Sequence, residues 1–281
     1  MNEIDRPAAL PPDLDAALTP MLAAGALPEG AALMYYPIVG STNDLAAALA
    51  ERGYPDSTIV VADEQVSGRG RGGHTWYSPP GTGLYTSVIV DAREGDAPQD
   101  WPRWLTLAAG VAISEGLHAA SGLPVAIKWP NDLVIAPSGT VRGARKLGGI
   151  LAEARSDGGQ LAHVIVGFGV NVQRSAFPQE ISARATSLED ELGREVDRGR
   201  VLEASLRRFL AWLHRLRAGQ TAAVVARWRE LAVGGSGAAI EWTRDGNRLR
   251  GVTAGIDAEG ALLVRAGAST ERVISGEVVW L

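Results

Sequence analysis

Lysine is nearly absent from this chain, and its two lysines stand beside other residues capable of chemistry. The sequence of 281 residues contains 27 lysines and arginines, of which only Lys128 and Lys146 are lysine. Lysine is a compact point charge and arginine a planar fork, so a site that needs one ammonium does not always accept arginine. From composition alone, retention of two lysines by chance in an arginine-rich chain explains the pattern as well as a functional requirement does.

Each lysine opens a short segment that is rich in polar groups or glycine. Residues 128–132 read Lys-Trp-Pro-Asn-Asp, and residues 146–153 read Lys-Leu-Gly-Gly-Ile-Leu-Ala-Glu. Pro130 prevents a strand from continuing, and polar groups at a strand end often form a ligand site, although Pro-Asn-Asp is also an ordinary turn. Adjacent glycines weaken a strand unless another group must come close, and residues 167–172, Gly-Phe-Gly-Val-Asn-Val, repeat that feature.

A glycine and arginine loop is the sharpest local feature. Residues 67–73 read Ser-Gly-Arg-Gly-Arg-Gly-Gly and precede His74 and Trp76. Glycines allow backbone N–H groups to approach an anion and allow the loop to change shape, and the arginines supply charge-assisted hydrogen bonds to phosphate or carboxylate. An RNA-binding tract would be longer and repeated, and fingerprints for dinucleotides and for P-loops are absent. We therefore expect a loop that closes over an anionic ligand.

The composition excludes several classes of protein. The formal net charge of −5 argues against a dedicated nucleic-acid binder, and the absence of cysteine removes thiol chemistry and disulfides. The four histidines have no ligand spacing, so we expect no structural metal. The acidic N-terminus does not resemble a secretory signal, and the longest apolar stretch, 105–113, is too short to span a membrane. We expect a cytoplasmic protein without nucleic-acid or membrane partners.

The elements that must position these residues form an α+β pattern. A capping box, Ser-Thr-Asn-Asp at 41–44, predicts a helix to residue 52, and further helices are expected at 104–120, 200–216 and 221–232. Short strands without regular βαβ alternation predict a mixed or antiparallel sheet. These strands are expected at 58–62, 84–90, 125–129, 133–136, 147–155 and 161–172.

The end of the chain is a separate β-rich segment. A glycine-rich linker at 233–237 precedes about five short strands, which predict a small barrel. Residues 1–33 hold at most one short helix.

Five segments together resemble bacterial biotin protein ligases in order and spacing, from about residue 34 to the end. These segments are 41–44, 63–71 with Trp76, 128–132, 145–151 and 167–172, and residues 236–281 resemble the small C-terminal domain of that family. The resemblance implies a class II synthetase-like catalytic domain at 34–233 with a mixed or antiparallel sheet packed with helices. An SH3-like β-barrel at 237–281 follows it, and residues 1–33 form an N-terminal extension.

The resemblance also implies the reaction. Biotin and MgATP would give biotinyl-5'-AMP, and a lysine of the biotin carboxyl carrier protein of acetyl-CoA carboxylase or a related carboxylase would then take the biotinyl group. Only about 33 residues precede the resemblance, too few for the DNA-binding domain of some members, so we expect a monofunctional enzyme. Magnesium would arrive with ATP rather than at a protein site, and a homodimer stays open.

The family's site residues map onto matching positions of this chain. The ureido ring and carboxylate of biotin would meet Ser41, Thr42, Asn43, Gln65, Arg69, Gly70, Arg71 and Lys146. ATP and the adenylate would meet Arg69, Arg71, His74, Trp76, Lys128, Asn131, Asp132, Lys146 and Asn171. The catalytic set would be Arg71, Lys146, Asp132 and Lys128, with Asp132 orienting the adenylate or taking the proton of the incoming amine.

One position departs from the family, and two other functions remain alternatives. His74 stands where many members have a second arginine. A lipoate or octanoyl ligase or transferase would share the fold, although Gln65 and the arginine loop suit a ureido ring better than an acyl chain. A protein that senses biotin or its adenylate without catalysis is the other alternative.

Overall fold

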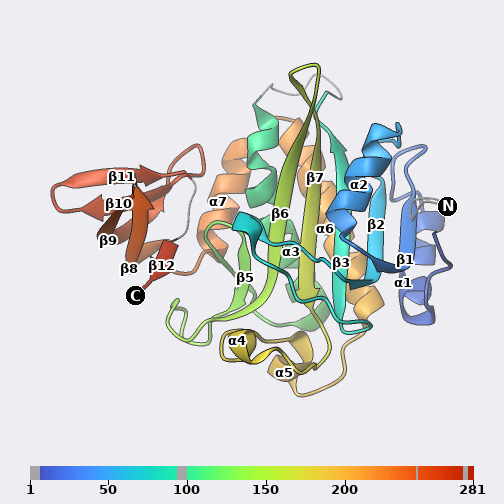
Figure 1. Ribbon diagram of the computed structural model, residues 1–281, viewed down its shortest axis with the longest axis horizontal. Helices are drawn as coiled ribbons and strands as arrows, with labels where there is room; N and C mark the ends of the chain where they lie inside the picture. The colour runs from blue at the N-terminus through green and yellow to red at the C-terminus, as the bar shows by residue number, and fades with distance from the viewer. Residues whose placement is uncertain (1–6, 94–99, 245, 275–277) are drawn as a thin grey trace.

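The computed structural model describes residues 7–93, 100–244, 246–274 and 278–281, and it contains two β-sheets (Figure 1). The larger sheet has seven strands in the order β1-β2-β3-β7-β6-β5-β4, and only the β1–β2 pair is parallel. The predicted mixed sheet is therefore confirmed. Its strands are β1 (Leu33–Val39), β2 (Ile59–Gln65), β3 (Gly83–Asp91), β4 (Ala126–Lys128), β5 (Asp132–Ile135), β6 (Arg145–Asp157) and β7 (Gln160–Asn171).

One face of this sheet is covered by long helices that hold the main core. The longest of them, α3 and α6, pack so closely that a Cβ on Gly116 would lie 2.5 Å from the Cα of Ser205. Gly122, with φ of 81°, ends α3 in the left-handed conformation that glycine favours. The helices on this face are α1 (Pro12–Ala23), α3 (Leu105–Ser121), α6 (Arg198–Arg217) and α7 (Thr221–Leu231), with the short 3-10 helix η3 (Trp101–Trp104) before α3.

The opposite face carries helix α2 (Thr42–Glu51) and the arginine loop, which contains the 3-10 turn η2 (Arg71–Gly73). Strand alternation sends Val61 toward the long helices and Val60 toward α2, as expected for a sheet buried on both faces. The first residues of α2 and the loop thus share one side of the sheet (Figure 1).

The C-terminal sheet is antiparallel, with five strands in the order β11-β10-β9-β8-β12. The Trp129 indole nitrogen donates a hydrogen bond of 3.1 Å to the carbonyl of Gly260, which joins this sheet to the end of β4. Its strands are β8 (Ser236–Arg244), β9 (Asn247–Ile256), β10 (Leu262–Ala266), β11 (Ser269–Val273) and β12 (Val278–Trp280).

Most expected elements are confirmed, but the capping box is not. Ser41 stands at the N-cap of α2, yet its hydroxyl makes no capping bond. The side chain of Asp44 pairs instead with Arg69, because the loop packs across the start of the helix. Besides the two 3-10 helices, three described elements were not predicted: β1, α4 (Gln179–Ser182) and α5 (Leu188–Leu192).

Among the described residues, no helix combines the length and the apolar character that a membrane span requires.

Candidate active site

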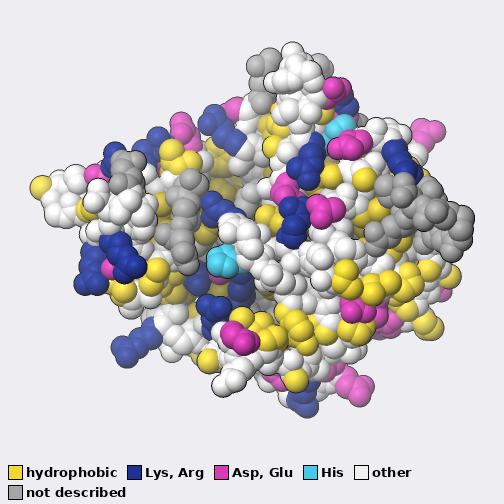
Figure 2. Space-filling view, in the orientation of Figure 1, with side chains coloured by type: hydrophobic (Ala, Val, Ile, Leu, Met, Phe, Trp, Pro, Cys, Tyr) yellow, Lys and Arg dark blue, Asp and Glu magenta, His cyan; other side chains and the backbone are white. Residues whose placement is uncertain are grey.

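A cleft of about 990 Å³ opens on the α2 face of the large sheet and extends to the C-terminal sheet. Figure 2 shows lysine and arginine side chains gathered on this face of the molecule between the two sheets. Every site residue expected from the sequence lines this cleft: Ser41, Thr42, Asn43, Gln65, Arg69, Gly70, Arg71, His74, Trp76, Lys128, Asn131, Asp132, Lys146 and Asn171.

The two lysines meet at one carboxylate. Lys146 Nζ lies 2.5 Å from Asp132 Oδ1, and Lys128 Nζ lies 3.6 Å from Asp132 Oδ2. Strands β4 and β5 bring Lys128 and Asp132 opposite each other, and β6 brings Lys146 alongside. One carboxylate cannot neutralise two ammonium groups, so this corner carries a net positive charge.

Arg71 adds a third cation without a partner of its own. Within the described part of the chain, its guanidinium makes no hydrogen bond or ion pair, although it lines the same cleft as Lys146. Burial lowers the pKa of Arg71, and the nearby Asp132 carboxylate opposes that shift. A guanidinium stays charged in proteins, so Arg71 offers unused donors to an anion.

Trp76 occupies a space that two strand glycines leave open. A Cβ on Gly169 would lie 2.4 Å from the Trp76 indole nitrogen, and one on Gly149 would lie 3.7 Å from the ring. Gly149 and Gly169 are register partners on β6 and β7, so together they form a flat seat for the indole. Lys146 Nζ lies 5.4 Å from the ring centroid, which places a cation beside an aromatic face.

A buried polar pocket lies at the start of α2. The Gln65 amide oxygen accepts hydrogen bonds from the Thr42 backbone N–H, at 2.9 Å, and from the Thr42 hydroxyl, at 3.1 Å. The Gln65 amide nitrogen donates to Ser78, at 2.9 Å. Ser41 is buried and makes no hydrogen bond to another described residue through its hydroxyl, so that group is available to a ligand.

Two amides hold the walls of the cleft in place. Asn131 donates to the carbonyl of Ile150 at 2.7 Å, and Asn171 donates to the carbonyl of Thr186 at 3.0 Å. Neither side-chain amide oxygen accepts a hydrogen bond from a described residue, so both are left for other donors. His74 is exposed at the rim, where its carbonyl accepts a 2.6 Å hydrogen bond from the Gly70 N–H and closes the loop into a hairpin.

Several residues of this site could not be found from the sequence. Ser78 and Ser87 support the polar pocket, and Glu153 contacts both the pocket and the loop. Strand β12 brings Val278 and Trp280 to the rim. Isolated serines and a glutamate in a strand give no signal of their own, because their role depends on contacts between distant segments.

Comparisons with known proteins agree with this geometry. Residues 35–171 match the biotin/lipoate A/B protein ligase family, and residues 235–280 match the biotin protein ligase C terminal domain. The chain is 34% identical over 250 residues to the biotin--[acetyl-CoA-carboxylase] ligase of Mycobacterium tuberculosis, covering 86% of each chain. It is also 34% identical over 254 residues to the bifunctional ligase/repressor BirA of Bacillus subtilis, covering 89% of this chain and 74% of that protein.

A solved structure gives the same indication. The biotin protein ligase from Aquifex aeolicus in complex with biotin and ATP superposes with a TM-score of 0.72 at 28% identity. The match covers 89% of this chain and 98% of that one.

Proposed function

The chain belongs to the biotin protein ligase family and is a ligase, and on that premise we propose a role for each part of its cleft. The cleft binds biotin and MgATP, joins them as biotinyl-5'-AMP with release of pyrophosphate, and passes the biotinyl group to a lysine. The acceptor is a biotin carboxyl carrier protein, because similar proteins are named for ligation to acetyl-CoA carboxylase. The observation that carries the proposal is the convergence of Arg71, Lys128 and Lys146 around Asp132 in one cleft.

The polar pocket at the start of α2 suits a urea. A fused urea ring presents two N–H donors and one carbonyl acceptor, each of which needs a partner when buried. The unused hydroxyl of Ser41 and the backbone of the loop near Gly70 supply such groups, while Thr42 and Gln65 are held in place by their mutual hydrogen bonds. An acyl chain without polar groups would leave the buried Ser41 hydroxyl without a partner.

The adenylate half of the ligand fits the wall beyond the lysines. Trp76 offers an aromatic face for adenine, and base stacking on an aromatic side chain is worth about 1 to 3 kcal/mol. Asn131 and Asn171 lie on the same wall, and among the described residues their amide oxygens have no donor. We assign residues 34–233 to the catalytic domain and residues 237–281 to the C-terminal domain, whose strand β12 borders this wall.

The first step needs positive charge where negative charge accumulates. The biotin carboxylate attacks the α-phosphorus, a P–O bond forms, and the bond to pyrophosphate breaks. Arg71 and Lys146 donate hydrogen bonds to the biotin carboxylate and to the phosphoryl oxygens. These bonds offset the repulsion between the two anionic groups and stabilise the transition state. Lys128 lies on the other side of Asp132 and supports the phosphate.

The second step needs a proton acceptor. The amine of the carrier lysine attacks the acyl carbonyl, a C–N bond forms, and AMP leaves with the electrons of the C–O bond. Asp132 lies between both lysines of the cleft and takes the proton that the amine loses.

Pyrophosphate exchange tests the first step. We expect exchange to depend on biotin and not on lipoate, and Lys146→Gln should lower its rate by about 10²- to 10³-fold, as removal of a transition-state donor does. Lys146→Arg should also lose at least about tenfold, because a planar fork cannot replace a point charge between two groups.

Arg145→Gln is the matched control. Arg145 is the neighbouring cation and pairs with Glu191 outside the cleft, at 2.7 Å, so its loss should leave exchange within about twofold. Exchange that responds only to lipoate, or full activity of Lys146→Gln, would overturn the proposal.

A further inference from the structure

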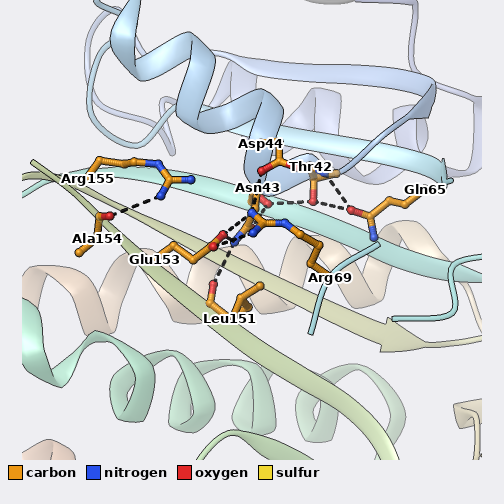
Figure 3. A network of polar contacts seen from close by, with 10 residues as sticks. Thr42, Asn43, Asp44, Gln65, Arg69, Leu151, Glu153, Ala154 and Arg155 are labelled. Atoms are coloured by element: carbon orange, nitrogen blue, oxygen red, sulfur yellow. Dashed lines mark hydrogen bonds and ion pairs between the residues drawn. The ribbon is translucent and has the colours of Figure 1, made fainter. Parts of the chain in front are cut away.

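The side chain of Arg69 turns toward two carboxylates and not toward the lysines of the cleft. Its guanidinium donates to both oxygens of Glu153, at 2.9 and 2.6 Å, and to Asp44 Oδ1, at 2.7 Å. Figure 3 shows these three side chains meeting over the start of α2. They come from the loop, from β6 and from α2, so one arginine ties the loop to two fixed elements.

Glu153 serves a second donor at the same time. Its Oε2 also accepts a 2.7 Å hydrogen bond from the Asn43 amide, which is buried in the polar pocket (Figure 3). The same Asn43 nitrogen contacts the carbonyl of Leu151 at 3.3 Å. Glu153 is therefore a shared acceptor for the arginine loop and for the pocket.

Asn43 is fixed from below as well. Ser87 Oγ lies 2.6 Å from Asn43 Oδ1, and an amide oxygen only accepts, so the serine donates. A Cβ on Gly167 would lie 2.1 Å from that oxygen, which leaves no room for a larger residue beneath it. Asn43, at the pocket end of the network, is therefore held rigidly. Arg69, at the loop end, is the residue that can separate from Glu153.

The exposure of the three charged partners supports this division. The side chains of Arg69 and Asp44 are 37% and 59% exposed, whereas that of Glu153 is 20% exposed. Ion pairs between exposed groups add little to folding stability. A contact of this strength on a glycine-rich loop holds one position without locking it.

We propose that Glu153 is a positioning residue that couples the biotin pocket to closure of the arginine loop, with Arg69 as the latch of that loop. The inference rests on the proposed function, because it requires the pocket to bind biotin and the loop to cover the adenylate. Closure places Arg71, two residues after the latch, in the cleft. Opening of the latch allows the labile adenylate to escape.

Two variants separate the two roles of Glu153. Glu153→Gln keeps an oxygen for Asn43 and removes the charge that binds Arg69, so free adenylate should leave the enzyme about five- to tenfold faster while KM for biotin changes by less than about threefold. Glu153→Ala removes both contacts, and KM for biotin should then rise about tenfold as well. The measurements are the release of labelled adenylate into a filtrate and steady-state KM values in pyrophosphate exchange.

A double variant tests the coupling. Arg69→Gln breaks the contact with Glu153 and also the contact with Asp44, so it should release adenylate at least as fast as Glu153→Gln. The double variant should release it no faster than Arg69→Gln, since Arg69→Gln alone already breaks the contact with Glu153. Arg272→Gln is the control, because Arg272 also bridges two carboxylates, Asp257 and Glu259, but in the C-terminal sheet. It should change neither release nor KM.

The outcomes separate this inference from the proposed function. Release within twofold of wild type in both single variants, or multiplied effects in the double variant, overturns the latch. Equal changes in Arg272→Gln also overturn it, because the effect would then be general. Absence of biotin-dependent exchange in the wild type would instead overturn the proposed function.

Discussion

Cationic side chains have their own carboxylate partners on one side of the large sheet and outnumber the carboxylates on the other. On the helical face, Arg198 is only 6% exposed and donates to Asp13 at 2.9 Å and to Asp63 at 2.7 Å. In the cleft, Arg71 has no ion pair with any described residue, and Asp132 alone faces Lys128 and Lys146. The first arrangement leaves no free cation for an anionic ligand, whereas the second leaves a surplus of positive charge.

The difference separates charges that hold the fold from charges that act on a ligand. Burial alone would lower the pKa of Arg198, but the hydrogen bonds to Asp13 and Asp63 outweigh it and raise that pKa. The pKa of Arg71 is lowered, because burial has no comparable compensation there. An anion in the cleft would supply the missing partner, which is the preorganisation that phosphoryl and acyl transfer require.

The largest loss of stability is expected from Arg198→Ala, which tests the paired side of the sheet. Its loss removes two charge-assisted hydrogen bonds, to Asp13 and to Asp63 of β2, each worth about 1.5 to 3 kcal/mol, so the free energy of unfolding should fall by about 3 to 5 kcal/mol. Urea unfolding measures the change. Arg200→Ala, two residues away and 82% exposed, is the control and should change stability by less than about 0.5 kcal/mol. A change below 1 kcal/mol in Arg198→Ala would remove the distinction between the two faces.

A second pair of opposite charges, Asp56 with Arg217, should make the stability of the protein depend on pH. Burial alone would raise the pKa of Asp56, but hydrogen bonds from Arg217, the Asp91 backbone and Ser57 lower it below its ordinary value of 3.8. Because the folded state favours the charged form, this stabilisation is complete at neutral pH. It is lost below about pH 4, as the pH falls through the unfolded and then the folded pKa.

Asp56→Asn tests this dependence. The variant should lose about 1.5 to 3 kcal/mol at pH 7, the value of hydrogen bonds to a charged group, and the difference from wild type should shrink toward pH 3. Urea unfolding at both values measures it. Asp100→Asn, which breaks an exposed pair with Arg103, is the control and should show no such trend. A difference that stays constant with pH would contradict the pairing argument.

The sequence predicted the elements that carry strong local patterns, and it missed those that depend on neighbours. Helix α3 is apolar over most of its surface and ends at Gly122, so its range could be predicted closely. Strand β1 was missed because Pro37 interrupts it, and proline is tolerated only because β1 is at the edge of the sheet. Edge position is a property of the fold and is not visible in a single segment.

The site shows the same division. The adjacent glycines at 148–149 and the Gly-Phe-Gly segment predicted a close approach, and the Trp76 indole on Gly149 and Gly169 is that approach. Glu153 and Asp44 gave no such signal, because their partner Arg69 is 84 and 25 residues away along the chain. Ser41 was expected to cap helix α2 as part of a capping box, but in the structure its hydroxyl makes no capping hydrogen bond.

Gly169→Ala tests the seat of Trp76 on the cleft side. The new methyl would overlap the indole, so the ring must shift. KM for ATP should rise about tenfold because adenine stacking, worth about 1 to 3 kcal/mol, is lost. KM for biotin should change little. Gly110→Ala in α3 is the control, since its methyl would meet Ile127 at an ordinary 3.7 Å. Equal changes in both KM values would show that Trp76 does not act on adenine alone.

The smallest stability effect is expected from Arg71→Ala, and it completes the comparison with Arg198. Arg71 makes no ion pair with a described residue, and its removal relieves repulsion with Lys128 and Lys146. The free energy of unfolding should therefore stay within about 0.5 kcal/mol of wild type. Biotin-dependent pyrophosphate exchange should nevertheless fall about 10²-fold, because a donor to the reacting groups is gone. A loss of stability as large as that of Arg198→Ala would mean that Arg71 supports the fold, and that the unbalanced charge of the cleft is not reserved for a ligand.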